Sequence, residues 1–104
     1  MFDGFIIIEM SARTPDTVFK AIADPTRREI LRLLKAGPRN AGDLAGEFDV
    51  TNGAMSHHFN VLKAAGLIRS ERDGQQIIYS LNITVFEDAA MMLTELFNVK
   101  KPRK

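Results

Sequence analysis

The sequence predicts a mainly α-helical domain with one small β-hairpin, in the order helix, helix, helix, helix, strand, strand, helix. The first observation behind this is that residues 51–65 sort into an apolar and a polar half at about 100° per residue. The second is Asp73-Gly74, a strong two-residue hairpin signal that separates LIRSER at 67–72 from QQIIYSL at 75–81. The third is a further apolar pattern of helical period that follows the hairpin and ends near residue 98.

The composition is typical of one domain. The chain has 104 residues, of which 45% are hydrophobic, enough for a modest single core. It has no cysteine, which excludes disulfides and thiolate metal sites. No apolar run approaches the ~18 residues of a membrane span, so we expect a cytoplasmic protein. Four of the 14 basic residues lie in 100–104, which leaves 10 basic against 13 acidic residues elsewhere. A nucleic-acid binder whose residues outside the tail are net negative requires a local basic patch.

The two ends of the chain leave alternatives open. Residues 1–13 form an N-terminal extension that can be disordered, or whose residues 2–8 can add a short strand or an apolar clip over the core. Alternatively, Met10 is the true start. The basic tail at 99–104 is either a solvated, disordered end or a DNA-binding arm. The domain itself is expected at 14–98.

Proline following a capping residue predicts the first two helices. Thr14-Pro15 begins a short helix, and Asp24-Pro25 begins a second one that ends at Gly37-Pro38. The first helix has one apolar side, made by Val18, Phe19 and Ile22, and in the second helix Ile30, Leu31 and Leu34 recur at core spacing. The charged side chains of the second helix are expected mostly outward, with phosphate contact as their only possible role: Arg27, Arg28, Arg32 and Lys35.

A third and a fourth helix follow, separated by a tight turn. Asn40 can cap the third, and Thr51 can cap the fourth, which Gly66 ends. Two helices joined in this way form a helix-turn-helix, whose second helix can lie in a DNA major groove. The polar half of residues 51–65 carries short hydrogen-bonding side chains and no acid: Asn52, Ser56, Asn60 and Lys63, with His57 at its edge. It is typical of a reading surface, because an ordinary solvated face would mix Glu with Lys.

The hairpin around Asp73-Gly74 is consistent with a wing. Ile77, Tyr79 and Leu81 alternate on one face. Polar side chains lie at the tip: Arg72, Gln75 and Gln76. The same residues are compatible with a hairpin that merely covers the core.

Thr84 to Glu87 is a capping box that predicts the start of the last helix. Its apolar side chains span roughly 160°, wider than the ~100° one buried face requires, so a twofold partner is expected. We expect this partner to contact Phe86, Ala90, Leu93 and Phe97, with Val18 and Phe19 of the first helix beside them. The adjacent stripe is expected to face the chain's own core: Val85, Ala89, Met92 and Leu96. The two stripes can also be exchanged.

Three blocks resemble the ArsR-type (arsenical-resistance repressor) winged helix-turn-helix family of transcription factors. They are DPTRREILRLL at 24–34, LAGEFDVTNGAMSHHFNVLKAAGLI at 44–68 and RDGQQIIYSLN at 72–82. With the flanking helices the resemblance covers 15–98. It implies a homodimer joined through the first and last helices, a recognition helix at 51–65, and repression by operator binding.

Departures from the family pattern are as informative. Many members sense metals through a cysteine pair in the helix matching 41–48 or through histidine and acidic ligands in the last helix. This chain has no cysteine, and its last helix has acids but no histidine. We therefore expect no metal and no cofactor, as in the small autorepressors of the family. His57 stands where the family often has arginine, and Gln75 and Gln76 stand where basic residues are common.

The leading prediction is a dimeric DNA-binding repressor. Ser56 and Asn60 are expected to meet base edges, Asn60 suiting adenine. Phosphate contacts are expected mostly from Thr51, Asn52, His57, Lys63, Arg69 and Arg72. His58, on the apolar half, is expected to be packed and hydrogen-bonded to backbone. A module that binds protein through this surface is the rival hypothesis. An enzyme is not expected, because no nucleophile–base set, phosphate loop or opposed carboxylate pair is found.

Overall fold

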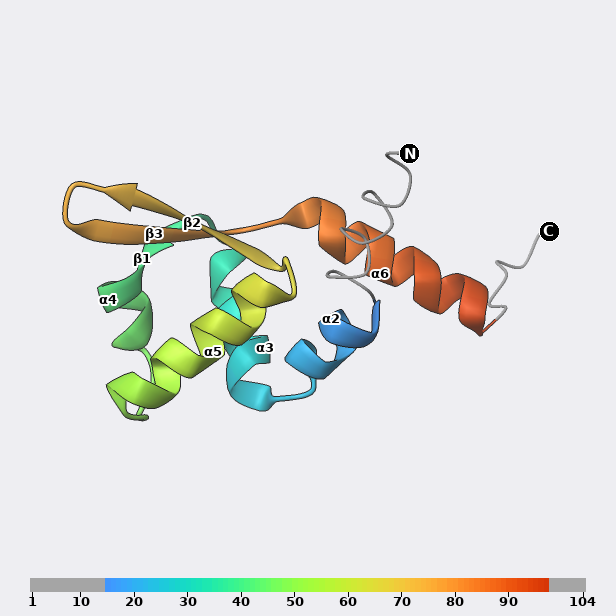
Figure 1. Cartoon of the computed structure of the whole chain (residues 1–104), viewed down its shortest axis with the longest axis horizontal. Helices are drawn as coiled ribbons and strands as arrows, with labels where there is room; N and C mark the ends of the chain where they lie inside the picture. Colours follow the sequence, from blue (N-terminus) through green and yellow to red (C-terminus); the bar gives the residue numbers. More distant parts are fainter. Residues whose placement is uncertain (1–14, 98–104) are drawn as a thin grey trace, which may run out of the picture.

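The computed structural model describes residues 15–97 (Figure 1). The predicted N-terminal extension at 1–13, the Thr14 cap and the basic tail at 99–104 lie outside the described residues. Within these residues, five helices and three short strands follow one another in the predicted order, with one strand added. None of the helices among residues 15–97 combines the length and apolarity that crossing a membrane requires.

The described helices are α2 (Pro15–Ile22), α3 (Pro25–Leu34), α4 (Ala41–Ala45), α5 (Asn52–Ala64) and α6 (Ile83–Leu96). Three of them, α3, α4 and α5, begin where capping side chains predict. Asp24 accepts the backbone N–H of Arg27 at 3.0 Å, and Asn40 accepts that of Asp43 at 2.7 Å. Thr51 caps α5 by accepting the N–H of Ala54 at 3.1 Å. These three predicted caps are confirmed.

The capping box predicted at Thr84 is wrong. The helix α6 begins one residue earlier, at Ile83, with Asn82 as an N-cap that makes no side-chain hydrogen bond. Strand β3 runs up to Leu81, so the chain turns directly from sheet into helix and Thr84 falls inside the first turn. A capping box needs its hydroxyl residue in extended backbone, and here that position belongs to Asn82.

The hairpin is present, with one strand that the sequence did not predict. β2 (Ile68–Asp73) pairs with β3 (Gln76–Leu81), and β1 (Arg39–Asn40) adds to the other side of β3. All pairings are antiparallel. Because Asp73 pairs with Gln76, the two-residue loop is Gly74-Gln75, one position later than predicted. Gly74 occupies the loop's first position with φ +67°, which favours glycine.

The core lies between α3, α5 and the sheet. It includes the predicted Ile30, Leu31 and Leu34 of α3, whose burial is confirmed. From α5 it takes Met55, Phe59 and Leu62. The Phe59 and Tyr79 rings pack with centroids 4.5 Å apart, joining α5 to strand β3. This contact fixes which side of α5 remains exposed.

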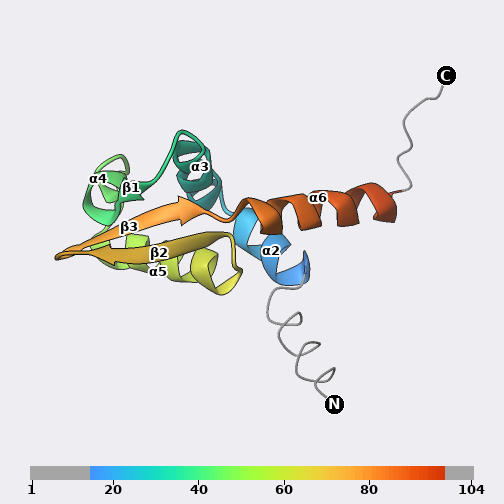
Figure 2. The same ribbon diagram turned by 90° about the horizontal axis from the view of Figure 1, so that it is seen from above.

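Helix α6 leaves the body of the domain. Its first half lies beside α2, and its second half projects beyond every other described element in both views (Figures 1 and 2). Val85 and Ala89 are buried, whereas every residue from Ala90 to Phe97 is exposed. The last turns of α6 therefore carry apolar side chains with no core beneath them.

Candidate nucleic-acid interface

The exposed side of α5 presents polar side chains on successive turns. Spacings of three and four residues place them on one surface. We call this surface the reading face: Asn52, Ser56, His57, Asn60 and Lys63, all exposed. No acid occurs between residues 51 and 70. The reading face therefore offers donors and acceptors without a carboxylate that would repel phosphate.

Ser56 and Asn60 lie at the middle of the reading face. Neither side chain makes an intramolecular hydrogen bond within residues 15–97, so their polar atoms remain available to an external partner. Asparagine can donate and accept with one amide, the pattern that pairs with adenine N6 and N7. Thr51 uses its hydroxyl oxygen for the α5 cap but keeps its O–H as a donor.

The opposite side of α5 is held firmly. Met55, Phe59 and Leu62 are 2%, 5% and 0% exposed. Side chains so enclosed hold one rotamer and fix the rotation of the helix about its axis. The reading face is thus presented in one orientation, as base recognition requires.

His58 is packed, as predicted, but its partner is not the backbone. Its side chain is 14% exposed, and its Nδ1 accepts from Arg27 Nη1 at 3.1 Å. A guanidinium can only donate, so Nδ1 is the acceptor in this contact. The Asp24 carboxylate lies 3.9 Å from the same Nδ1. The predicted backbone partner of His58 is therefore wrong.

Arg27 is also placed differently from the prediction. Besides His58, it donates through Nε to the carbonyl of Ala21 at 2.6 Å and through Nη2 to that of Lys20 at 3.4 Å. Arg28 donates to the carbonyl of Ile22 at 3.0 Å. The last carbonyls of a helix lack partners within the helix, so the two arginines satisfy the end of α2. Arg27 is a structural link between α2, α3 and α5 and is not free for phosphate.

The Asp24 carboxylate completes this junction. The backbone N–H of Arg27, which it accepts, holds the pKa of Asp24 below its ordinary value, against an opposing effect of desolvation. The positive charge of Arg27 acts in the same direction as the N–H. Asp24 thus begins α3 and partly neutralises the cation that supports α5.

The β2–β3 hairpin, which we call the wing, carries the other predicted contact residues. Arg69, Arg72, Gln75 and Gln76 are all exposed. Gln76 Oε1 accepts from Asn40 Nδ2 at 3.4 Å, which joins the wing to the start of α4. The tip of the wing and the N-terminal end of α5 lie at the same end of the molecule (Figures 1 and 2). The reading face and the wing can therefore contact the same extended partner.

The residues predicted to meet a second copy fall into three groups. Val18 is 2% exposed in the chain's own core, so it offers no surface to a partner and that prediction is corrected. Phe19 and Phe86 are half-buried against the core. Ala90 is exposed, and Leu93 and Phe97 on the projecting part of α6 are 39% and 66% exposed.

No group of three histidine or acidic side chains that could hold a metal ion is found among residues 15–97. His58 Nδ1 lies 3.9 Å from Asp24 Oδ2, and this nitrogen already accepts from Arg27. His57 and His58 have ring centroids 5.8 Å apart, and only His57 lies on the exposed side.

Comparisons with known proteins agree with this arrangement. A family described as "Helix-turn-helix domain" matches residues 22–71. The transcriptional repressor SdpR of Bacillus subtilis (strain 168) is 49% identical over 83 residues, which are 80% of this chain and 92% of the relative. The arsenical resistance operon repressor of Staphylococcus aureus is 34% identical over 79 residues, 76% of each chain. The solved structure of an ArsR-like transcriptional regulator from Rhodococcus sp. RHA1 superposes with a TM-score of 0.73 at 32% identity, over 81% of this chain and 79% of the other.

Proposed function

Because the chain belongs to the ArsR-type winged helix-turn-helix family of DNA-binding transcriptional regulators, we propose that it is a repressor that acts as a homodimer on an inverted-repeat operator. The family and the fold are those of DNA-binding regulators and not of enzymes. The related proteins from Bacillus and Staphylococcus are both named as repressors, which supports repression here. Its place of action is the cytoplasm, where an operator is accessible.

The observation that carries the proposal is the acid-free reading face on a rigidly held α5. Ser56 and Asn60 read base edges in the major groove, since their polar atoms are exposed and uncommitted. The remaining predicted contacts position phosphates: Thr51, Asn52, His57, Lys63, Arg69 and Arg72. Gln75 and Gln76 contribute uncharged contacts at the tip of the wing.

Dimerisation is supported by the apolar surface of α6. Six of the eight large apolar side chains that are exposed among residues 15–97 lie on this helix or at its C-cap: Ile83, Met91, Met92, Leu93, Leu96 and Phe97. So much exposed apolar surface on one helix is typical of an interface. A twofold pairing of α6 helices through the stripe of Leu93 and Phe97 covers part of it and places two reading faces on one DNA duplex.

Selection of bound fragments from a random DNA pool tests the proposal. Two recognition helices in successive major grooves require half-sites about one helical turn, ~34 Å, apart. The pool should therefore return a near-palindrome, and binding should weaken steeply with added salt. Recovery of single, unpaired half-sites would refute the homodimeric mode, and the absence of any selected duplex would favour the protein-binding alternative.

A further inference from the structure

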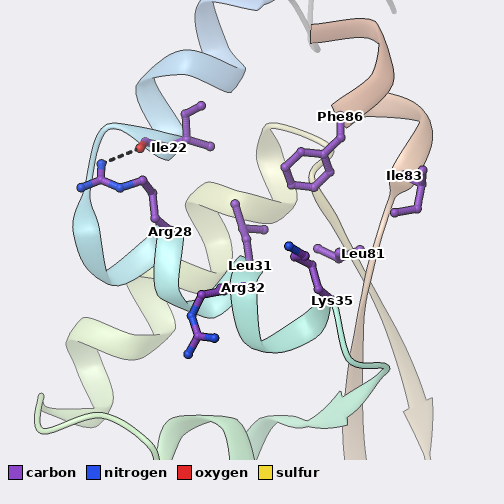
Figure 3. Close-up of a pocket in the computed structure, with 8 residues that line it drawn as sticks. All are labelled: Ile22, Arg28, Leu31, Arg32, Lys35, Leu81, Ile83 and Phe86. Carbon is purple, nitrogen blue, oxygen red and sulfur yellow. Dashed lines mark hydrogen bonds between the residues drawn. The ribbon is translucent and has the colours of Figure 1, made fainter. Parts of the chain in front are cut away.

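A pocket of about 480 Å³ opens between α2, α3, β3 and α6, away from the reading face. Its volume falls in the range of small-molecule sites, roughly 300–1,000 Å³. Its walls are apolar and come from all four elements: Ile22, Leu31, Leu81, Ile83 and Phe86. Figure 3 shows the Phe86 ring and the Leu31 side chain facing each other across it. An apolar molecule that enters the pocket buries its surface against several walls and so loses contact with water there.

Three basic side chains of α3 border the pocket, and two of them already have partners. Arg28 donates to the carbonyl of Ile22 at 3.0 Å. Arg32 forms a two-contact ion pair with Glu29, its Nε lying 2.9 Å from Oε1, and its guanidinium points away from the pocket (Figure 3). Lys35 makes no hydrogen bond or ion pair within residues 15–97. Its side chain lies between Leu31 and Leu81, so one uncommitted ammonium stands at an apolar cavity (Figure 3).

We propose that this pocket binds a small monocarboxylate with an apolar body, whose carboxylate pairs with Lys35. An ammonium beside apolar walls is complementary to an anion that carries its own apolar part. A purely polar anion gains nothing from the walls, and an uncharged apolar molecule leaves Lys35 without a partner. The chemistry of the lining therefore selects an amphipathic acid.

The location makes this ligand an effector, an inference that rests on the proposed function. Leu31 and Lys35 belong to α3, which packs on α5 and holds it through the Arg27–His58 bond. Ile83 and Phe86 begin α6, the helix proposed to join the dimer. A ligand wedged between α3 and α6 changes the angle between the reading face and the dimer helix. The separation of the two reading faces, and hence operator affinity, follows that angle.

Calorimetric titration of the full-length chain with sodium octanoate, without DNA, tests the ligand. We expect saturable binding of one octanoate per protomer, about tenfold tighter than octanol, which has the same chain without the charge. Lys35→Met should reduce the affinity for octanoate to the affinity for octanol. Lys20→Met, the same change at an exposed lysine outside the pocket, should leave the preference intact. Ile83→Glu places a negative charge at a position that is 54% exposed. It should lower the affinity for octanoate at least tenfold without unfolding the domain.

Three results would overturn the site: no saturable octanoate binding, equal affinity for octanol, or a Lys35→Met protein that keeps the preference. A dimer that binds neither probe and dissociates on Ile83→Glu would show that a second copy fills the pocket. The effector role is decided separately, by operator affinity with and without octanoate, and an unchanged affinity rejects it. If no operator is found at all, the proposed function fails while calorimetry still decides the ligand.

Discussion

Arg27 on α3 and His58 on α5 meet through a hydrogen bond of 3.1 Å from Nη1 to Nδ1. The same guanidinium holds the carbonyls of Ala21 and Lys20 at the end of α2. One side chain thus sets the positions of three helices, and the third of these carries the reading face. The orientation of the reading face depends on this polar junction as well as on the apolar core.

We expect Arg27→Met to lower the free energy of unfolding by about 1–3 kcal/mol, because it leaves half-buried acceptors without a donor. Arg28→Met removes the same charge from the next position but only one exposed hydrogen bond, and should cost less than about 1 kcal/mol. Urea unfolding of the two variants compares them directly. Equal costs for both would show that the Arg27 junction contributes no more than a surface contact.

The Asp24 cap should make part of the stability depend on pH. Its folded pKa is lowered by the Arg27 N–H, so the ionised cap stabilises the fold above the unfolded-state pKa of ~3.9. That contribution is lost as the pH falls through the lower folded pKa. Asp24→Asn keeps a capping oxygen but cannot ionise, whereas Asp24→Ala loses the cap and about 1 kcal/mol. Urea unfolding measures the difference in the free energy of unfolding between wild type and Asp24→Asn. This difference should be constant from about pH 5 to 8 and should become smaller below ~4. A difference that persists unchanged at low pH contradicts this account of Asp24.

Most of the fold could be predicted because its signals are local. The caps Asp24, Asn40 and Thr51 act on N–H groups three residues away, and the α5 pattern depends only on helical period. Strand β1 could not be predicted in this way. Arg39 and Asn40 form a strand only by pairing with Tyr79 and Ile78, nearly forty residues later.

The parts of the site that the sequence missed are long-range polar contacts. The spacing of Arg27 in α3 favours an outward side chain, and only the packed structure brings the end of α2 and His58 within its reach. The apolar side of the first helix predicts Val18 beside the partner, and only the packed structure shows this side chain buried in the chain's own core. The Lys35 pocket likewise combines four elements, and no sequence motif marks it.

Substitutions of base-reading residues should change sequence preference, whereas substitutions of phosphate-contacting residues should not. Ser56→Ala and Asn60→Ala should each cost on the order of 1–3 kcal/mol at the cognate site and relax preference there, if each makes a good base contact. Arg72→Ala should weaken binding to all duplexes similarly. It should also reduce the salt dependence of the affinity by about one released counterion. Pool selection repeated with each variant gives the readout. An unchanged motif after Asn60→Ala would mean that the reading face is rotated from where we place it.

Operator binding should be insensitive to zinc, arsenite and thiol reagents. The sequence has no cysteine, and its two histidines are adjacent, with His58 bonded to Arg27. Titration with each reagent, followed by fluorescence anisotropy of a labelled operator, measures this. A reproducible loss of affinity at micromolar zinc would reveal a metal site, and His57→Ala would then show whether the reading face supplies it.

Leu93→Glu should convert the dimer to a monomer and abolish tight operator binding. Leu93 is 39% exposed on the projecting part of α6, in the stripe with Phe86, Ala90 and Phe97 that we assign to the partner. A carboxylate there faces its own symmetry mate in an apolar seam, which adds repulsion to desolvation. The monomer keeps its core, since Val85 and Ala89 are the α6 residues buried against it.

Met91→Glu is the matched control for this variant. Met91 is 62% exposed on the same helix, but at about 100° per residue it falls outside the stripes of Leu93 and of Val85. Met91→Glu should therefore remain dimeric and hold the operator. Sedimentation gives the oligomeric state, and anisotropy gives the affinity, which should fall by a factor of about 10²–10⁴ for Leu93→Glu because two linked half-sites no longer bind together. If the Leu93→Glu protein stays dimeric at wild-type operator affinity while Met91→Glu dissociates, the partner lies on the opposite side of α6.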